Sequence, residues 1–550
     1  MKRPSNAKND TENTEKKFRA SSNETEGELK DGIFQVSSPL VKGNNVEGNM
    51  VSATRIHSVI MNDHISEWLR LYGDNVAKPS PMLEFLMTKG HTFEYNINQI
   101  LKRENNSSLE EKGNQINTIS ADGKYDQKQV DQTIEAMKKG TPIISSAPLQ
   151  DPNLQIYGVA DLLVRSDFIN KLFPEFKGNF LNQGCLFSKD WHYVVIDIKF
   201  STLPLRADGV HILNQGHYKA YKSQLYIYNR ALGYLQGYTP RKAFILGRKY
   251  KYTSRGQVFS GNCAFDRLGC IDYYGVDRDV PSQTNEAIKW IRSLRETGRD
   301  WTLTDHPELY PNMKYESMFQ SSKKVLSEKL NEITQMWYCG VNQREIALSK
   351  GVSSWRDPSF SADLVEIRGQ RGITLNQILE VNRTSIDILP LKMRRMTAFL
   401  KKGYVKEFFV DFETIGGMFD EFNSLPIAQC QNMIFMITVG WVNFDEEKKE
   451  IYQHKTFTAE NLQVESERKI MNQFLSLIGH DSELFHWSDA EPNEWLSALK
   501  RHDMNQKDSL KDRWTDLHYI FREEPITVKG ALNYSLKSIA KAMLKLGYIS

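Results

Sequence analysis

The sequence has few cysteines and no long apolar run. Its five cysteines are scattered through 550 residues without a Cys-x-x-Cys pair, which disfavours a disulfide framework, a zinc site and an iron–sulfur cluster. No stretch approaches the roughly 20 apolar residues that cross a bilayer, and the N-terminus lacks the apolar core of a secretory signal. These absences predict an intracellular protein, in the cytoplasm or nucleus, with no membrane partner.

The formal net charge of the chain is also small, at +3. A total this small does not by itself indicate a nucleic-acid-binding protein, so any such function has to rest on a local site. The chain has neither a GxxxxGK[ST] phosphate loop nor a helicase motif, which argues against an ATP-driven function. The remaining composition, 40% hydrophobic and 25% charged, is typical of globular proteins, and the length predicts two or more domains.

Changes of pattern along the chain predict four segments. Residues 1–52 are rich in Asn, Ser, Lys and Glu and contain little to bury, so they are predicted to form a disordered tail. Residues 53–290 alternate helical spacings with strand-like runs such as HYVVIDIKF, which predicts an α/β domain. Residues 291–402 have the pattern of short helices and are predicted to connect this domain to a second α/β domain, residues 403–550, which is not a copy of the first.

Acidic side chains recur in three separated pieces of the first α/β domain, GHTFE, GVAD and DIK. Hydrolysis of a phosphodiester needs a hard cation to neutralise the phosphate and to acidify the attacking water. Magnesium prefers oxygen ligands, often two or three carboxylates, and Glu94, Asp161 and Asp197 are suited to supply them. Lys199 lies two residues after Asp197 on a predicted strand, hence on the same face, where its ammonium can stabilise developing negative charge.

A fourth piece, QLYIY, lies in a predicted helix. Gln224 and Tyr228 are four residues apart and share a helical face, from which they could hydrogen-bond a phosphate or brace the lysine. Each piece alone also has an ordinary explanation, such as a charge pair that faces solvent. Two acids and a lysine in apolar strands are costly to bury unless a metal or ligand pairs them, so the combination favours a site.

Taken in this order, the four pieces resemble the RecB-type exonuclease branch of the PD-(D/E)XK superfamily. That branch shows GxxxE, GxxD, DxK after an apolar run, and QxxxY. The matching positions are Gly90/Glu94, Gly158/Asp161, Asp197/Lys199 and Gln224/Tyr228. The resemblance covers about residues 80–250 and implies that the three acids bind Mg²⁺ or Mn²⁺ with the lysine at the cleavage centre. Some relatives carry an iron–sulfur cluster, but Cys185, Cys263 and Cys270 do not reproduce its spacing.

A second acidic pair occurs in EFFVDFET, where Asp411 and Glu413 lie two apart on a predicted strand. This DxE pair resembles the first element of DnaQ-like exonucleases of the RNase H-type fold, which bind two cations with four acids. In the place of their second motif, FHWSDAE offers His486 and Glu491, with Asp489 as a nearby substitute.

The fourth acid of that set has no counterpart before Ser550, so residues 403–550 are predicted to form an incomplete RNase H-like domain. Three explanations stay open: the domain is inactive and binds nucleic acid or acts as a scaffold, another chain completes it, or the reading frame is truncated. A solvated strand end accounts for Asp411 and Glu413 about equally well.

Together these patterns predict an α/β protein that is a magnesium-dependent nuclease, acting on DNA in preference to RNA. We expect an exonuclease or end-processing enzyme of DNA repair, replication or mobile-element handling, with a helicase or another replication or repair protein as a candidate partner. Two alternatives remain: a catalytically impaired scaffold that binds nucleic acid, and a metal-dependent phosphohydrolase of small nucleotides.

Overall fold

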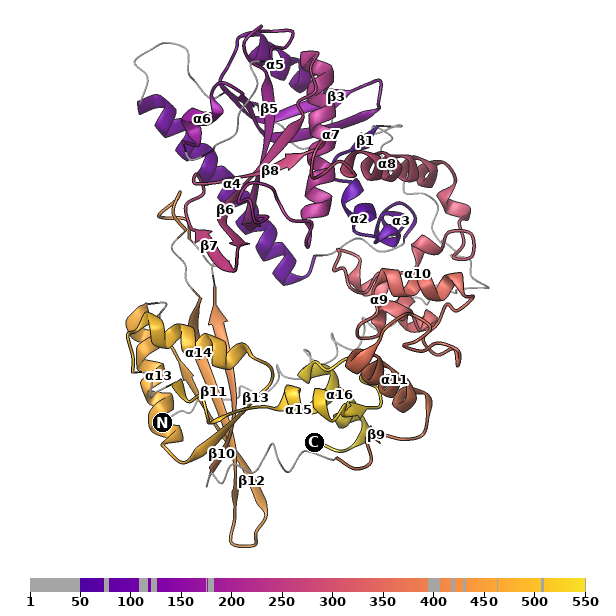
Figure 1. Cartoon of the computed structure of the whole chain (residues 1–550), viewed down its shortest axis with the longest axis vertical. Helices are drawn as coiled ribbons and strands as arrows, with labels where there is room; N and C mark the ends of the chain where they lie inside the picture. The colour runs from indigo at the N-terminus through magenta and orange to yellow at the C-terminus, as the bar shows by residue number, and fades with distance from the viewer. Residues whose placement is uncertain are drawn as a thin grey trace, which may run out of the picture.

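The protein is a mixed α/β molecule with two large sheets, as predicted (Figure 1). A computed structural model describes residues 50–73, 79–107, 117–119, 126–174, 176, 183–393, 406–416, 421–428, 432–461, 463–505 and 509–549. Most of the predicted disordered tail, residues 1–49, lies outside this part of the chain, as does Cys430. No described helix combines the length and the apolar character needed to cross a membrane.

The first sheet has the strand order β2-β3-β4-β5-β6-β7, with β1 beside β4 and β8 beside β6. Its strands are β1 (Val51–Ser52), β2 (Asn117–Thr118), β3 (Ile143–Asp151), β4 (Ile156–Arg165), β5 (Tyr193–Pro204), β6 (Lys242–Ser254), β7 (Gln257–Gly261) and β8 (Leu268–Asp272). Strands β3, β4 and β5 are antiparallel, whereas β5 and β6 are parallel. A parallel pair needs a crossover, which α7 (Tyr218–Gln236) provides.

Helices cover both faces of this sheet, which explains why its central strands are apolar on both sides. Besides α7, they are α2 (Ile56–Ile60), α3 (His64–Tyr72), α4 (Pro81–Ser107), α5 (Gln127–Lys138), α6 (Ile169–Leu172) and α8 (Val280–Thr297). Helix α7 packs against β3, β4 and β5 on one face, and α4 packs against β5 on the other. The local sequence sets the helix ends: the Asp126 side chain caps α5, and Gly237 ends α7 in the left-handed conformation.

The second sheet has the order β12-β11-β10-β13-β14. Its strands are β10 (Lys406–Ile415), β11 (Met433–Phe444), β12 (Glu450–Thr458), β13 (Ser482–His486) and β14 (Trp514–Asp516). Strands β10, β11 and β12 are antiparallel neighbours, and β13 and β14 continue the sheet in parallel with β10. Alternate residues of β10, Phe408 and Val410, pack under α13 (Val464–Ile478) and α14 (Ala490–Arg501), so Asp411 and Glu413 emerge on the opposite face.

The middle of the chain consists of short helices and shares a core with the C-terminal segment. Its elements are η1 (Gly298–Asp300), η2 (Pro307–Leu309), α9 (Gln320–Leu330), η3 (Ile333–Gln335), α10 (Val341–Ser349), α11 (Gly369–Arg383) and β9 (Ile388–Leu389). The C-terminal segment adds α15 (Leu517–Glu523), β15 (Thr527–Val528) and α16 (Leu536–Leu546). Strand β15 pairs with β9, and one hydrophobic cluster joins residues of both segments, from Ile333 to Ala542.

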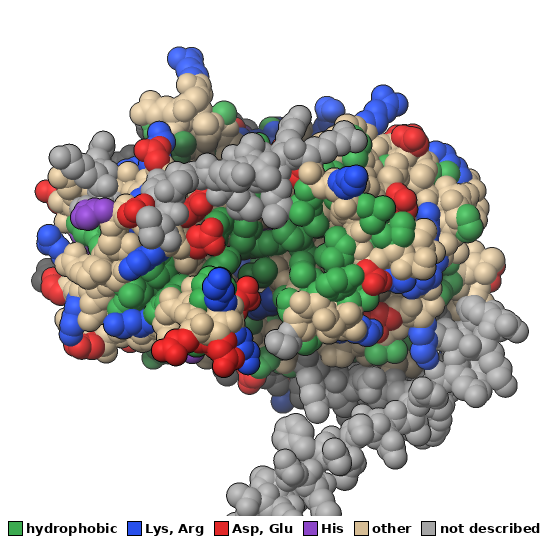
Figure 2. Space-filling model, turned by 90° about the horizontal axis from the view of Figure 1, so that it is seen from below, with side chains coloured by type: hydrophobic (Ala, Val, Ile, Leu, Met, Phe, Trp, Pro, Cys, Tyr) green, Lys and Arg blue, Asp and Glu red, His purple; other side chains and the backbone are tan. Residues whose placement is uncertain are grey.

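The side of the molecule seen from below carries a central group of hydrophobic side chains with charged side chains around it (Figure 2). Above this side, in the view of Figure 1, the second sheet and the α11–α16 region lie next to each other. Residues 421–428, between β10 and β11, contact the first domain, where Phe422 packs against Phe93 and Phe200. Two backbone hydrogen bonds, from Ala264 N to Pro426 O and from Ala428 N to Asn262 O, hold them there.

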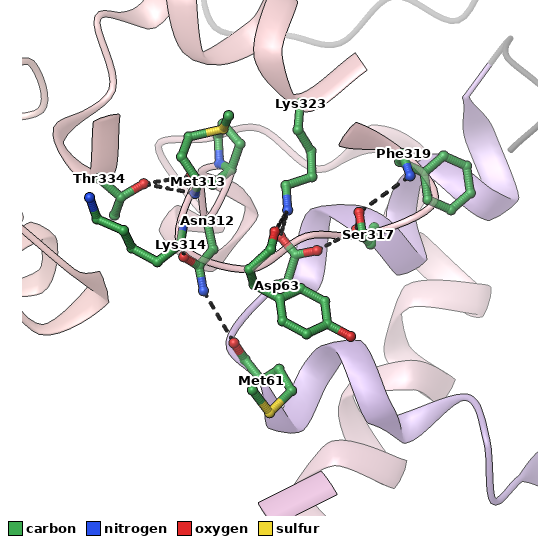
Figure 3. Close-up of polar contacts among 12 residues, drawn as sticks. Met61, Asp63, Asn312, Met313, Lys314, Ser317, Phe319, Lys323 and Thr334 are labelled. Atoms are coloured by element: carbon green, nitrogen blue, oxygen red, sulfur yellow. Dashed lines mark hydrogen bonds and ion pairs between the residues drawn. The ribbon is translucent and has the colours of Figure 1, made fainter. Parts of the chain in front are cut away.

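A buried ion pair joins the N-terminal helices to the middle segment (Figure 3). Lys323 Nζ on α9 lies 2.9 Å from Asp63 Oδ1, and both side chains are fully buried. Lys323 Nζ also donates to the Tyr315 carbonyl, and Asn312 Nδ2 donates to the Met61 carbonyl. Burial raises the pKa of Asp63 in spite of the lysine, so the carboxylate depends on this cation to stay ionised.

We expect Lys323→Met to lower the free energy of unfolding by about 3–5 kcal/mol, because it leaves Asp63 buried without its cation. The matched control is Lys324→Met, which removes the neighbouring, exposed lysine and its 3.9 Å contact to Glu328 and should cost less than about 1 kcal/mol. Urea unfolding followed by circular dichroism measures both. Equal losses in the two variants would contradict the role given to the buried pair.

Candidate functional site

Asp161 and Asp197 lie on neighbouring strands at the same level of the first sheet. Strands β4 and β5 pair in antiparallel register, with Leu162 opposite Ile196, so the two acids are the next residues beyond that pair. The Ile198 backbone N–H donates a 2.6 Å hydrogen bond to Asp161 Oδ2, which fixes one carboxylate against the other strand. Two of the three predicted acids are therefore brought together.

Asp197 and Lys199 point to the same side of β5, as expected for residues two apart on a strand. Asp197 is fully buried, and Lys199 Nζ lies 2.5 Å from its Oδ2 atom. Neither Asp197 oxygen accepts a hydrogen bond of standard geometry from the described residues. The ammonium also lies 5.1 Å from the centre of the Tyr221 ring, which braces it from the side of α7.

Glu94, on α4, completes a group of three acids that interact electrostatically. Burial raises the pKa of Asp161 well above its ordinary value, and the charges of Asp197 and Glu94 raise it further against the attraction of Lys199. Burial likewise raises the pKa of Glu94, with Lys199 opposing the shift and Asp197 adding to it. Burial alone would lower the pKa of Lys199, but the two aspartates outweigh it and keep the lysine charged. The site thus gathers three carboxyl groups around one cation, and this crowding, with burial, raises the pKa of Asp161 and Glu94.

The Gln-xxx-Tyr and Gly-xx-Asp pieces meet in space. Gln224 Nε2 donates a 2.7 Å hydrogen bond to the Tyr228 hydroxyl on the next turn of α7. The Tyr228 ring lies so close to Gly158 that a Cβ at that position would stand 2.3 Å from a ring carbon, which explains the glycine. Burial raises the pKa of Tyr228, and the Asp197 and Asp161 charges add to the shift, so the phenol stays neutral beside the acids. Gly90 has no such neighbour, because a Cβ there would meet nothing within 4 Å.

A cluster of aromatic and histidine rings next to Lys199 was not predicted. The rings of His57 and His217 stack with centroids 5.5 Å apart, and the Tyr315 hydroxyl lies 3.0 Å from His57 Nδ1. Burial, with the nearby charges of His217 and Lys199, lowers the pKa of His57 to about 4. Tyr221 could have been found from its helical spacing with Gln224 and Tyr228, whereas His57 and Tyr315 come from distant segments that carry no local signal.

The carboxylate oxygens of the candidate site are the type of ligand that a hard cation prefers, but they are not arranged around a common point as metal ligands are. Within the described ranges, no group of three or more His, Cys, Asp and Glu side chains is arranged to hold a metal ion. Asp197 nevertheless presents a buried carboxylate with no standard hydrogen bond, next to a second acid held by a backbone N–H. A bound cation would supply the positive charge that compensates these carboxylates, once the Glu94 or Lys199 side chain moves to make room for it.

The acids of the second predicted group, on β10 and at the start of α14, interact electrostatically. Asp411 and Glu413 are exposed on β10, and Glu491 is buried in the first turn of α14, with Oε2 3.6 Å from His486 Nδ1. Partial burial raises the pKa of Asp411, and the charges of Glu491 and Glu413 add to this while Lys537 opposes it. The three acids are thus electrostatically coupled.

Two other acids near this group have structural positions. Asp516 Oδ1 accepts hydrogen bonds from the backbone N–H groups of Ser488 and His518 and so caps α15. Asp489 is exposed and precedes the first turn of α14. Glu491 is therefore the residue of FHWSDAE that approaches the Asp411 and Glu413 pair.

Comparison with known proteins adds no relative to this description. No known protein family matches the chain, and no curated protein is significantly similar to it. The functional argument therefore rests on the side chains and their arrangement.

We expect Asp161→Asn to stabilise the metal-free protein by about 0.5–2 kcal/mol, because it removes one of several like charges. Since the folded-state pKa of Asp161 is raised, the wild type loses stability as pH rises through that pKa, and the variant should not show this loss. The amide oxygen can still accept the Ile198 hydrogen bond. Thermal unfolding with chelator across a pH series tests this, and a destabilised variant would contradict the charge argument.

Proposed function

We propose that this protein is a divalent-metal-dependent nuclease that hydrolyses DNA phosphodiester bonds at the site of Glu94, Asp161, Asp197 and Lys199. The observation that carries the proposal is the fully buried Asp197 carboxylate between a second acid and an ammonium. Burial of this charge combination is unfavourable for stability alone, which is expected where a ligand supplies the compensating interactions.

The arrangement of elements supports an assignment of residues 53–290 to the RecB-type PD-(D/E)XK nucleases. Helix α4 carries Glu94, β4 carries Asp161, β5 carries Asp197 with Lys199, and α7 carries Gln224 with Tyr228. Asp161, Asp197 and Lys199 are neighbours on paired strands, α7 packs against both strands, and Glu94 interacts with these residues electrostatically. Such an arrangement is not expected from four unrelated surface motifs.

The proposed chemistry divides between a cation and the lysine. Mg²⁺ or Mn²⁺, when bound by the three acids, would neutralise charge on the phosphate and lower the pKa of a water molecule. Lys199 would hold the attacking hydroxide and stabilise the charge that develops on the phosphate. Asp161 is positioned by the Ile198 N–H, and Tyr221 limits the directions that the lysine can take.

The C-terminal region supports a more restricted proposal. The strand order β12-β11-β10-β13-β14 and the coupled acids Asp411, Glu413 and Glu491 fit an RNase H-like domain of the DnaQ type. Two of these acids are exposed, and the charge of Lys537, on α16, acts on Asp411. We assign this region to nucleic-acid binding or scaffolding, which is also the second candidate for the whole protein. A role in end processing during repair, replication or mobile-element handling, with a helicase as partner, belongs to the same proposal.

Asp197→Ala should reduce cleavage of end-labelled DNA to the level seen with chelator, because it removes the carboxylate shared by the cation and Lys199. The control is Asp131→Ala, which removes an exposed acid of α5. Single- and double-stranded DNA and RNA are incubated with Mg²⁺, Mn²⁺ or chelator, and products are resolved by length. Unchanged cleavage by the Asp197 variant would remove the proposal, and binding without metal-dependent products in the wild type would select the scaffold.

Lys199→Ala in the same assay should lower turnover by about 10²–10³-fold with little change in metal affinity. An equal loss of metal affinity would contradict the role given to the lysine. Turnover of mononucleotides without dependence on chain length would instead select a phosphohydrolase of small nucleotides.

A further inference from the structure

The hairpin formed by β6 and β7 has a one-sided charge. From Arg241 to Phe265 the chain contains six cations, Arg241, Lys242, Arg248, Lys249, Lys251 and Arg255, and no acid. Across the whole chain the 71 cations and 68 acids nearly balance, so this stretch is a local exception. Lys251 and Arg255 are exposed.

This hairpin starts at the level of the candidate site. On the paired strands β5 and β6, Lys199 lies opposite Gly247, and the first cation of the projecting part, Arg248, follows directly. From Gly247 the strand continues for seven residues to Ser254, about 23 Å of extended chain. In Figure 1 the hairpin lies at the lower end of the first sheet, near the β10–β11 region. The hairpin therefore begins beside the candidate site and projects away from it.

Aromatic rings accompany the cations. Tyr252 on β6 stacks on Phe259 of β7, with ring centroids 4.9 Å apart and planes 12° from parallel. Tyr250 extends the stack, 6.3 Å from Tyr252. One face of the Phe259 ring therefore lies against Tyr252. The Phe259 side chain is 36% exposed, and that of its neighbour Val258 is 56% exposed. A partly exposed ring supported by a second ring, on a hairpin that also carries exposed cations, is a combination with which proteins bind single-stranded nucleic acid.

The tip of the hairpin carries a cation in a conformation that does not favour it. Arg255 and Gly256 form the two-residue turn between the paired residues Ser254 and Gln257, and both have positive φ, 49° and 79°. A turn of this kind prefers Asn or Gly at the Arg255 position. The arginine therefore gives the turn no conformational advantage. What it offers at this position is its exposed, charged guanidinium group.

We propose that the β6–β7 hairpin binds a single-stranded DNA segment next to the cleavage site, with Lys251 and Arg255 on its phosphates and Phe259 against a base. This inference rests on the nuclease function proposed above. A single strand is favoured over a duplex because the base faces of a duplex are covered by their stacked neighbours, whereas an exposed ring can stack on an unpaired base.

The first test measures binding, not cleavage. A fluorescently labelled single-stranded oligonucleotide is titrated with full-length protein in chelator, at several salt concentrations. Lys251→Gln with Arg255→Asn should weaken binding and reduce the slope of log K against log salt by about 1.4, because about 0.7 is lost per phosphate contact. Lys324→Gln with Lys329→Gln removes two exposed cations of α9 and should leave the slope unchanged.

A measurement of the variant's stability shows whether weaker binding comes from lost contacts or from misfolding. Asn suits the turn better than Arg, so the variant should be at least as stable as the wild type while binding more weakly. An unchanged slope in this folded variant would overturn the proposal.

Phe259→Ala should weaken binding of the single strand by roughly tenfold, whereas Phe259→Trp should retain it. Equal affinity for a duplex of the same sequence, or no effect of Phe259→Ala, would overturn the proposal. These outcomes are independent of catalysis: weak binding by the hairpin variants together with an inactive wild type would remove the nuclease function and keep the hairpin. Normal binding by the hairpin variants together with loss of cleavage in Asp197→Ala would do the reverse.

Discussion

The crowding of carboxylates around Lys199 is the constraint on which the first domain depends. Asp197 is fully buried in a strand whose neighbours are apolar, and one ammonium serves both this acid and the charges of Asp161 and Glu94. A core built for stability alone would avoid this arrangement, since buried ion pairs seldom stabilise more than the hydrophobic residues they replace. The surrounding sheet and the helices α4 and α7 hold the charges at close range, and that is the condition for binding a hard cation.

Contacts between distant parts of the chain keep this site in one structure with the rest of the molecule. Phe422, from the region between β10 and β11, packs against Phe93 and Phe200, which are the chain neighbours of Glu94 and Lys199. On the other side, the buried pair of Asp63 and Lys323 joins the N-terminal helices to the middle segment. Residues 421–428, between β10 and β11, and the middle segment therefore both contact the domain that carries the site.

The sequence predicted the parts whose signal is local. The apolar runs of β3 to β6 and the spacing of α7 identified these elements. Asp197 with Lys199, and Asp411 with Glu413, were predicted from residues two apart on a strand, and each pair does lie on one strand. The pairing of β9 with β15 was not predictable, because two-residue strands carry no periodic pattern. The close contact of Gly158 with Tyr228, the approach of His57 to Lys199 and the contact of Tyr315 with His57 arise only when α2, α7 and the middle segment pack together. Tertiary packing decided these features.

The most direct measurement of the central claim is the location of manganese in crystals of the protein soaked with Mn²⁺. The account predicts an anomalous peak about 2 Å from carboxylate oxygens of Asp161 and Asp197, with Glu94 or Lys199 displaced from its position in the metal-free protein. A well-ordered site without a peak, in crystals that bind Mn²⁺ elsewhere, would contradict it.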